Sequence, residues 1–188
     1  MIRIYYKTFG LLTAAALAAA APAFANAAAY PIVGGAEMLP MKTIAENAAN
    51  SQDHTTLVAA VKAAGLVDTL NSTGPFTVFA PTNAAFAKLP AGTVDTLLKP
   101  ENKALLAKIL TYHVVAGKVT AAELIGMIKA GGGSATLTTV SGGKLTAAIM
   151  DGKVMLTDEK GGMATVTKAD VMQKNGVIHV TDAVSLPN

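Results

Sequence analysis

GPFTVFAPTNAAF, residues 74–86, is the most informative stretch of this sequence. Its residues 76–80 are mostly apolar on both faces of an extended chain, which predicts a short strand buried on both sides. Pro81 ends that strand, and Thr82 or Asn83 supplies a side chain that can cap a helix. The stretch therefore predicts a buried strand that leads directly into a short helix.

The segment before this strand has the pattern of helices. Thr43 and Glu46 have the spacing of a capping box, which predicts a short helix that ends near Asn50. Asp53 can cap a second helix, in which apolar residues recur at helical spacing until Gly65 ends it. The chain before the buried strand is thus expected to be mainly helical.

Two further helices are expected between the buried strand and a run of three glycines at residues 131–133. Pro100 is well placed at the start of the first, whose apolar residues share one face. Thr120 and Glu123 form a second capping box at the start of the other. Between these helices, residues 112–115 have the pattern of a strand.

The last third of the sequence changes its hydrophobic period from about 3.6 to 2 residues, which is typical of strands. If Asp151-Gly152 is a two-residue hairpin turn, Ile149 pairs with Val154 and Ala147 with Leu156, and one face is apolar. The expected antiparallel strands cover residues 135–140, 144–150, 153–158, 163–172 and 176–182. Helices or a second sheet must cover the apolar face, so the predicted fold class is α+β.

A second informative stretch is NGVIHVTDAV at residues 175–184. Its first two residues, Asn175-Gly176, predict the last hairpin turn, and the rest predict the closing strand. Together with residues 74–86 and the segment Tyr112-His113-Val114-Val115 between them, it resembles the sequence boxes of fasciclin domains in order and spacing. The resemblance covers residues 41–187. It implies a wedge-shaped β-sandwich of short antiparallel strands with several α-helices packed around it.

The resemblance also implies an extracellular role in adhesion or matrix interaction. The family's Tyr-His motif, which is implicated in integrin binding, falls on Tyr112 and His113, with Leu110 and Val114 beside them. The alternative is a junction between helix and strand, in which His113 hydrogen-bonds backbone groups and Tyr112 packs. The second interpretation is favoured, because buried ring nitrogens need partners.

The family's acidic adhesion motif falls on Asp170, Val171 and Met172, just before the second box. Lys168 and Ala169 stand where the family usually has Glu-Pro, which reverses a charge and removes a rigid turn. This departure argues against an integrin activity at the segment. The favoured alternative is that Asp170 accepts backbone hydrogen bonds at a bend in the strand.

The N-terminus predicts export. Residues 1–25 combine the basic residues Arg3 and Lys7, an apolar run too short to span a bilayer and a small-residue cleavage site, as secretory signal peptides do. Their removal leaves 13 lysines against 12 acidic residues. Residues 26–40 are expected to form a flexible N-terminal arm, and residues 41–187 to form one domain.

Composition excludes several functions. The chain has no cysteine, which excludes disulfides, thiolate metal sites and a cysteine nucleophile. Arg3 is its one arginine, so nucleic acid is not an expected partner of the mature chain. The histidines His54, His113 and His179 lack metal-ligand spacing, and no nucleophile motif is present. We therefore expect no metal, cofactor, catalytic residue or membrane-spanning segment.

The expected function is that of an exported, non-enzymatic module, secreted or in the periplasm, that contacts a cell-surface or matrix protein. The identity of that protein and the oligomeric state do not follow from the sequence. The alternative is a periplasmic binding protein for a small hydrophobic ligand, because the Ala- and Met-rich composition could line an apolar pocket. That alternative requires a large apolar cavity, whereas otherwise these residues simply fill the core.

Overall fold

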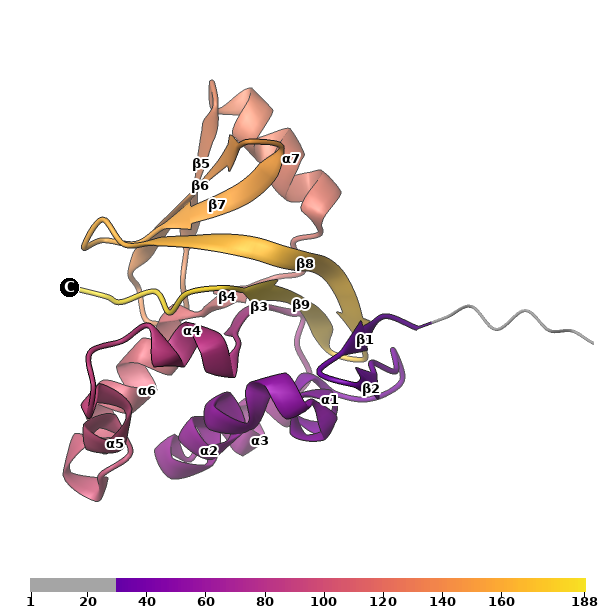
Figure 1. The fold of residues 1–188 in the computed structure, drawn as a ribbon. Helices are drawn as coiled ribbons and strands as arrows, with labels where there is room; N and C mark the ends of the chain where they lie inside the picture. Colours follow the sequence, from indigo (N-terminus) through magenta and orange to yellow (C-terminus); the bar gives the residue numbers. More distant parts are fainter. Residues whose placement is uncertain (1–29) are drawn as a thin grey trace, which may run out of the picture.

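The computed structural model describes residues 30–188, and Figure 1 shows how they are arranged. The predicted signal peptide, residues 1–25, lies outside the described residues. The helices are α1 (Ile44–Asn50), α2 (Thr55–Ala64), α3 (Val67–Asn71), α4 (Asn83–Ala87), α5 (Thr93–Leu97), α6 (Lys103–Tyr112) and α7 (Ala121–Ala130), with 3-10 turns at Gln52–His54 and Pro100–Asn102. The strands are β1 (Ile32–Val33), β2 (Ala36–Glu37), β3 (Phe76–Pro81), β4 (Val114–Ala116), β5 (Ser134–Thr138), β6 (Lys144–Met150), β7 (Lys153–Thr157), β8 (Met163–Gln173) and β9 (Gly176–Thr181).

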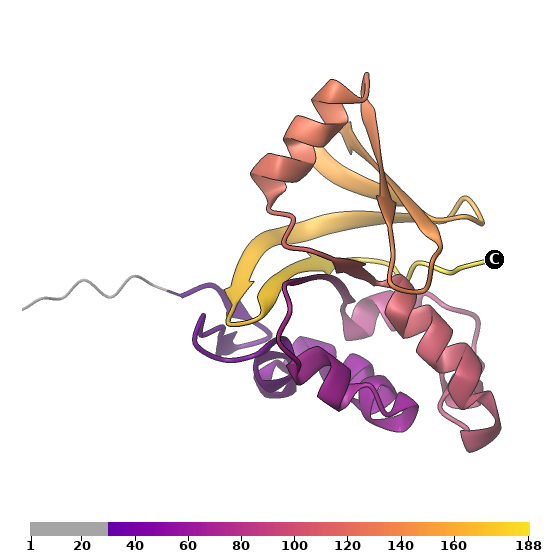
Figure 2. The same ribbon diagram turned by 180° about the vertical axis from the view of Figure 1, so that it is seen from behind.

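Seven strands form one sheet in the order β4-β3-β9-β8-β7-β6-β5. The buried strand β3 runs parallel to β9 and antiparallel to β4, while β5 to β9 form an antiparallel meander. A bridge between Val115 and Thr139 brings the two ends of the sheet together. The sheet is therefore bent into a wedge rather than flat (Figures 1 and 2).

Helices cover the sheet in two groups, which divide the molecule into two halves. The helical half consists of α1 to α6 with strands β3, β4 and β9; its core includes Ile44, Leu57, Val78 and Ile178. The meander half consists of β5 to β8 with α7, which lies across the upper strands in Figure 1. Leu124 and Ile128 of α7 belong to its core. The α+β fold class and the packing of helices around the strands are confirmed.

Local signals in the sequence account for several of the helix ends. Thr43 with Glu46 and Thr120 with Glu123 form the two predicted capping boxes at the starts of α1 and α7. Gly65 ends α2 in the left-handed region with φ of 73°, which glycine adopts without steric cost. The prediction that Asp53 caps the second helix is wrong, because Asp53 lies in the 3-10 turn Gln52–His54 and the N-cap residue of α2 is His54.

The register of the β6–β7 hairpin also follows the sequence. Ala147 pairs with Leu156 and Ile149 with Val154, as predicted. Asp151 and Gly152 both have positive φ, as a two-residue turn of this kind requires. The alternation turns Ala147 and Leu156 inward, and both are fully buried.

The last hairpin differs from the prediction. Gln173 pairs with Gly176, so the turn residues are Lys174 and Asn175, and Gly176 is the first residue of β9. A Cβ at Gly176 would lie within 1.9 Å of the Phe76 carbonyl oxygen. The glycine is therefore required by the close approach of the parallel strand β3 rather than by a turn.

Two other predictions need correction. Residues 112–115 were expected to form a strand, but Tyr112 is the last residue of α6 and β4 begins at Val114. Residues 26–40 were expected to form a flexible arm, but from residue 30 the chain forms the hairpin β1–β2, with Val33 and Met38 buried. Two apolar side chains anchor this segment against the helical half. Helix α5 was not predicted.

Candidate functional site

The predicted Tyr-His segment lies at the junction between α6 and β4, inside the molecule. Tyr112, His113 and Val114 are 0%, 3% and 8% exposed. The Tyr112 hydroxyl donates a hydrogen bond to the Lys144 carbonyl at 2.6 Å and accepts one from the Glu159 backbone N–H at 3.1 Å. Burial raises the pKa of this hydroxyl, so it stays protonated. Tyr112 thus links the end of α6 to the turns that flank β6 and β8.

Both ring nitrogens of His113 are occupied by backbone groups. Nδ1 donates to the Ile109 carbonyl at 2.8 Å, and Nε2 accepts from the Ser185 backbone N–H at 3.0 Å. Burial lowers the pKa of this ring, so it is neutral in the folded protein. His113 therefore fixes the C-terminal segment to the start of β4, which agrees with the favoured alternative of a junction.

Two acidic residues in the turn between β7 and β8 hold the same C-terminal segment. Asp158 is 8% exposed and accepts hydrogen bonds from the backbone N–H groups of Gly162 and Leu186 at 2.7 and 2.8 Å. Glu159 accepts from Lys144 N and Asn188 N. Sequence reasoning missed this role of Asp158 because its partner Leu186 lies 28 residues away in the sequence.

The second predicted segment, Asp170 to Met172, lies at a bulge in β8. Asp170 has a φ of 56°, and its carboxylate accepts from the Ala121 backbone N–H at 2.7 Å, at the start of α7. Val171 is fully buried, and Met172 is half-buried. The backbone N–H of Asp170 donates to Nδ1 of His179 at 3.3 Å. Asp170 thus accepts a backbone hydrogen bond at a bend, as the favoured alternative held.

His179 completes this junction. Its Nε2 donates to the Val119 carbonyl at 2.9 Å, and its ring stacks on Phe79 with 5.6 Å between centroids. Burial lowers its pKa, as for His113. Among residues 30–188, no hydrogen bond joins the Tyr112–Val114 segment to the Asp170–Met172 segment. Each segment instead anchors a different part of the chain.

Asn175 is a structural residue whose role sequence reasoning missed. Its Oδ1 accepts from the Ile44 backbone N–H at 3.0 Å, at the start of α1. Its Nδ2 donates to the Leu70 and Ser72 carbonyls at 2.7 and 2.9 Å. The asparagine therefore joins the β8–β9 turn to α1 and α3. Its position beside Gly176 suggested only a turn, so the sequence contained no signal for these contacts.

A cavity of about 250 Å³ lies within the helical half. Side chains of α1, α2 and α3 form one wall, and residues of β3, β4, β9 and the end of α6 form the other. Leu110, His113 and Val114 of the predicted Tyr-His segment are part of its lining. Protein interiors rarely contain voids much larger than a water molecule. The ligand-binding alternative requires a cavity of this kind.

Other kinds of site have no counterpart in the described part of the chain. Residues 30–188 contain no group of three His, Asp or Glu side chains placed to hold a metal ion. No helix in the same range is long and apolar enough to cross a bilayer. The Oγ atom of Ser51 lies 2.8 Å from Nδ1 of His54, but both residues are buried, and Nε2 of His54 has no hydrogen-bond partner among residues 30–188. This pair lacks the acidic residue that orients a catalytic histidine.

Comparison with known proteins agrees with the fold. The family model of the fasciclin domain matches residues 52–187. Protein sll1483 of Synechocystis is 56% identical over 145 residues, which cover 77% of this chain and 73% of that protein. Immunogenic protein MPB70 of Mycobacterium bovis is 40% identical over 149 residues, which cover 77% and 68%.

A solved structure is also similar. It is a domain pair from the insect cell adhesion molecule fasciclin I, with a TM-score of 0.67 and 21% sequence identity. The alignment covers 76% of this chain and 50% of that one. At this identity the match is evidence of a shared fold.

Proposed function

This chain belongs to the fasciclin domain family, and from that premise we propose that it is a non-enzymatic module that contacts a cell-surface or matrix protein. The observation that carries the proposal is the family match over most of the folded chain. The insect neighbour is named as a cell adhesion molecule. We further propose that residues 1–25 direct export, so that the module acts in the periplasm or outside the cell.

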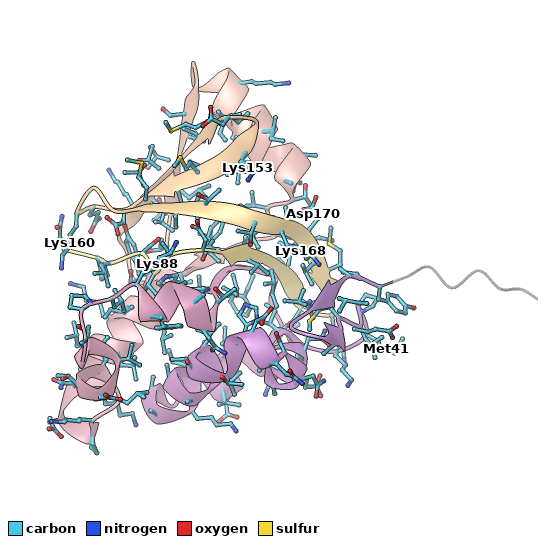
Figure 3. All side chains as sticks on the ribbon, in the orientation of Figure 1. Met41, Lys88, Lys153, Lys160, Lys168 and Asp170 are labelled. Carbon is cyan, nitrogen blue, oxygen red and sulfur yellow. The ribbon has the colours of Figure 1, made fainter. Side chains whose placement is uncertain are left out.

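We propose the bulge of β8 as the contact surface. The pairing of β8 with β7 ends at Thr165, so within residues 30–188 the residues that follow have no strand partner on that side. Thr167, Lys168 and Ala169 are exposed there, and Figure 3 shows Lys168 and Asp170 at the bend of β8. An exposed strand edge with a cationic side chain suits an extended, acidic segment of another protein.

The roles of the predicted partner-binding residues follow from their surroundings. Asp170 holds the bulge against α7, and Val171 and Met172 continue the strand behind it. We propose that these residues present the exposed part of β8. Tyr112, His113 and Val114 are buried, so we propose that they act on any partner through the fold rather than by direct contact.

An attachment assay tests this proposal. A strain that lacks the gene is complemented with the wild-type chain, with Lys168→Glu or with Lys160→Glu, and cell attachment or aggregation is counted. Both lysines are exposed, but Lys160 lies in the turn between β7 and β8, at the opposite end of β8 from the bulge (Figure 3). We expect Lys168→Glu to lose most of the rescue and Lys160→Glu to retain it. Normal attachment of the deletion strain under every condition would contradict the adhesive function.

A further inference from the structure

We propose that the cavity in the helical half binds the hydrocarbon chain of a lipid-like molecule that has a single polar end. This site is separate from the β8 bulge, so the inference goes beyond protein contact and does not depend on it. Either an acyl lipid or an isoprenoid could supply such a hydrocarbon chain.

The wall of the cavity excludes a ligand with polar groups along its length. Its deep lining consists of aliphatic and aromatic side chains: Ile44, Leu57, Val61, Phe76, Val78 and Ile178. His113 is the one ring with nitrogen atoms in the lining, and both of its nitrogens already bond backbone groups. A polar atom of the ligand would therefore lose its water without gaining a hydrogen bond, which is costly.

Small residues on α1 keep the cavity open. Ala45, Ala48 and Ala49 line the cavity, and their single-carbon side chains leave space that longer side chains would occupy. The volume of about 250 Å³ exceeds the roughly 150 Å³ of an apolar cavity that binds benzene. It is smaller than a typical pocket for a drug-sized ligand, which starts at about 300 Å³. This size suits one chain segment and is too small for a two-chain phospholipid.

One charged side chain in the lining is free to meet a polar end group. Glu46 is engaged by Thr43 of its own capping box, and the Thr111 hydroxyl donates to the Ala107 carbonyl at 2.7 Å. Lys62 is exposed, and none of the ion pairs between residues 30–188 involves it. An anionic end group, such as a carboxylate, could therefore pair with Lys62 while the chain fills the cavity.

The binding test uses residues 26–188 and the fluorescent fatty acid cis-parinaric acid. We expect a saturable rise in fluorescence that corresponds to one bound probe per protein molecule. Val58→Phe places a ring in the cavity from a half-buried position and should weaken binding at least tenfold. Ala122→Phe places the same ring on the exposed face of α7 and should leave binding unchanged. Equal binding by wild type and Val58→Phe would overturn the proposal.

Displacement of the bound probe distinguishes an acyl ligand from an isoprenoid ligand. Oleate and geranylgeraniol are added separately to the complex with the probe, and the better competitor identifies the chain type. Lys62→Ala should weaken oleate several-fold and leave the uncharged alcohol unaffected, with Lys129→Ala on α7 as the control.

A readout without substitutions covers the case in which Val58→Phe fails to fold. The thermal unfolding midpoint of the wild type should rise with the concentration of the better competitor, because a ligand of the native state stabilises it. No rise with either compound, together with no saturable probe signal, would overturn the proposal. Loss of attachment by Lys168→Glu would not bear on this result, so the two proposals can fail separately.

Discussion

The two halves of the molecule share one sheet, but their cores are packed differently. In the meander half, Leu145, Ala147 and Leu156 are fully buried beneath α7. In the helical half, three alanines of α1 line a cavity of about 250 Å³. The regular strand pattern thus buries its inward side chains completely, whereas the assembly of short helices leaves space that a ligand can use.

The largest effect expected from this difference concerns two leucines. Leu156→Ala should lower the free energy of unfolding by about 4 kcal/mol, because a fully buried leucine leaves a cavity in a filled core. Leu57→Ala should cost about 2 kcal/mol, because Leu57 already borders empty space. Chemical denaturation of both variants and the wild type measures the two values.

If both variants lose the same free energy of unfolding, Leu57 is packed as tightly as Leu156 despite the neighbouring cavity. A larger loss for Leu57→Ala than for Leu156→Ala would contradict the comparison. The midpoint and the slope of each transition are needed, since a change in slope signals a change in the unfolded state.

Features fixed by near neighbours in the sequence could be predicted, and features fixed by distant ones could not. The register of β6 with β7 follows from alternation and the Asp151-Gly152 turn, and the caps of α1 and α7 from the spacing of Thr and Glu. The parallel pairing of β3 with β9 joins segments about a hundred residues apart. No local pattern specified that pairing.

The candidate sites show the same limit. The resemblance identified Tyr112, His113 and Asp170 as residues of interest, and the structure gives each of them specific hydrogen bonds. Their partners, such as Ser185 for His113 and Ala121 for Asp170, lie 72 and 49 residues away. The cavity was equally hidden, because its lining comes from seven elements whose relative placement only the fold determines.

Acid should destabilise the protein, since a neutral histidine is buried at each of the two junctions. Burial lowers the pKa of His113 and of His179, so the unfolded chain binds protons that the folded chain does not. Their contribution to stability is complete above the unfolded pKa of about 6.5 and is lost as the pH falls below it. Urea unfolding between pH 7.5 and 5 should therefore show a falling free energy.

Variants assign this pH dependence to its residues. The slope of the free energy of unfolding against pH reports how many protons the chain takes up when it unfolds. His113→Gln and His179→Gln should each lower that number by up to one, whatever their effect on stability at pH 7. A slope equal to that of the wild type in both variants would show that other groups titrate over this range.

The smallest difference is expected between the two capping boxes. Thr43→Ala and Thr120→Ala each remove a side chain that accepts from the backbone N–H three residues later, which costs about 1 kcal/mol. Thr43→Ala should cost slightly more, because the Thr43 hydroxyl also donates to Oδ1 of Asn71 at 2.7 Å. Thermal and chemical unfolding should agree on this order. A greater cost for Thr120→Ala would show that the contact with Asn71 adds nothing.

A methyl NMR titration of residues 26–188 with oleate, and in parallel with geranylgeraniol, tests the difference between the halves most directly. The account predicts that the better ligand shifts the methyl signals of Ile44, Leu57, Val61 and Ile178, which line the cavity. It predicts no shift for Leu145 and Leu156 in the meander half. Shifts confined to the meander half, or no saturable shift with either compound, would contradict it.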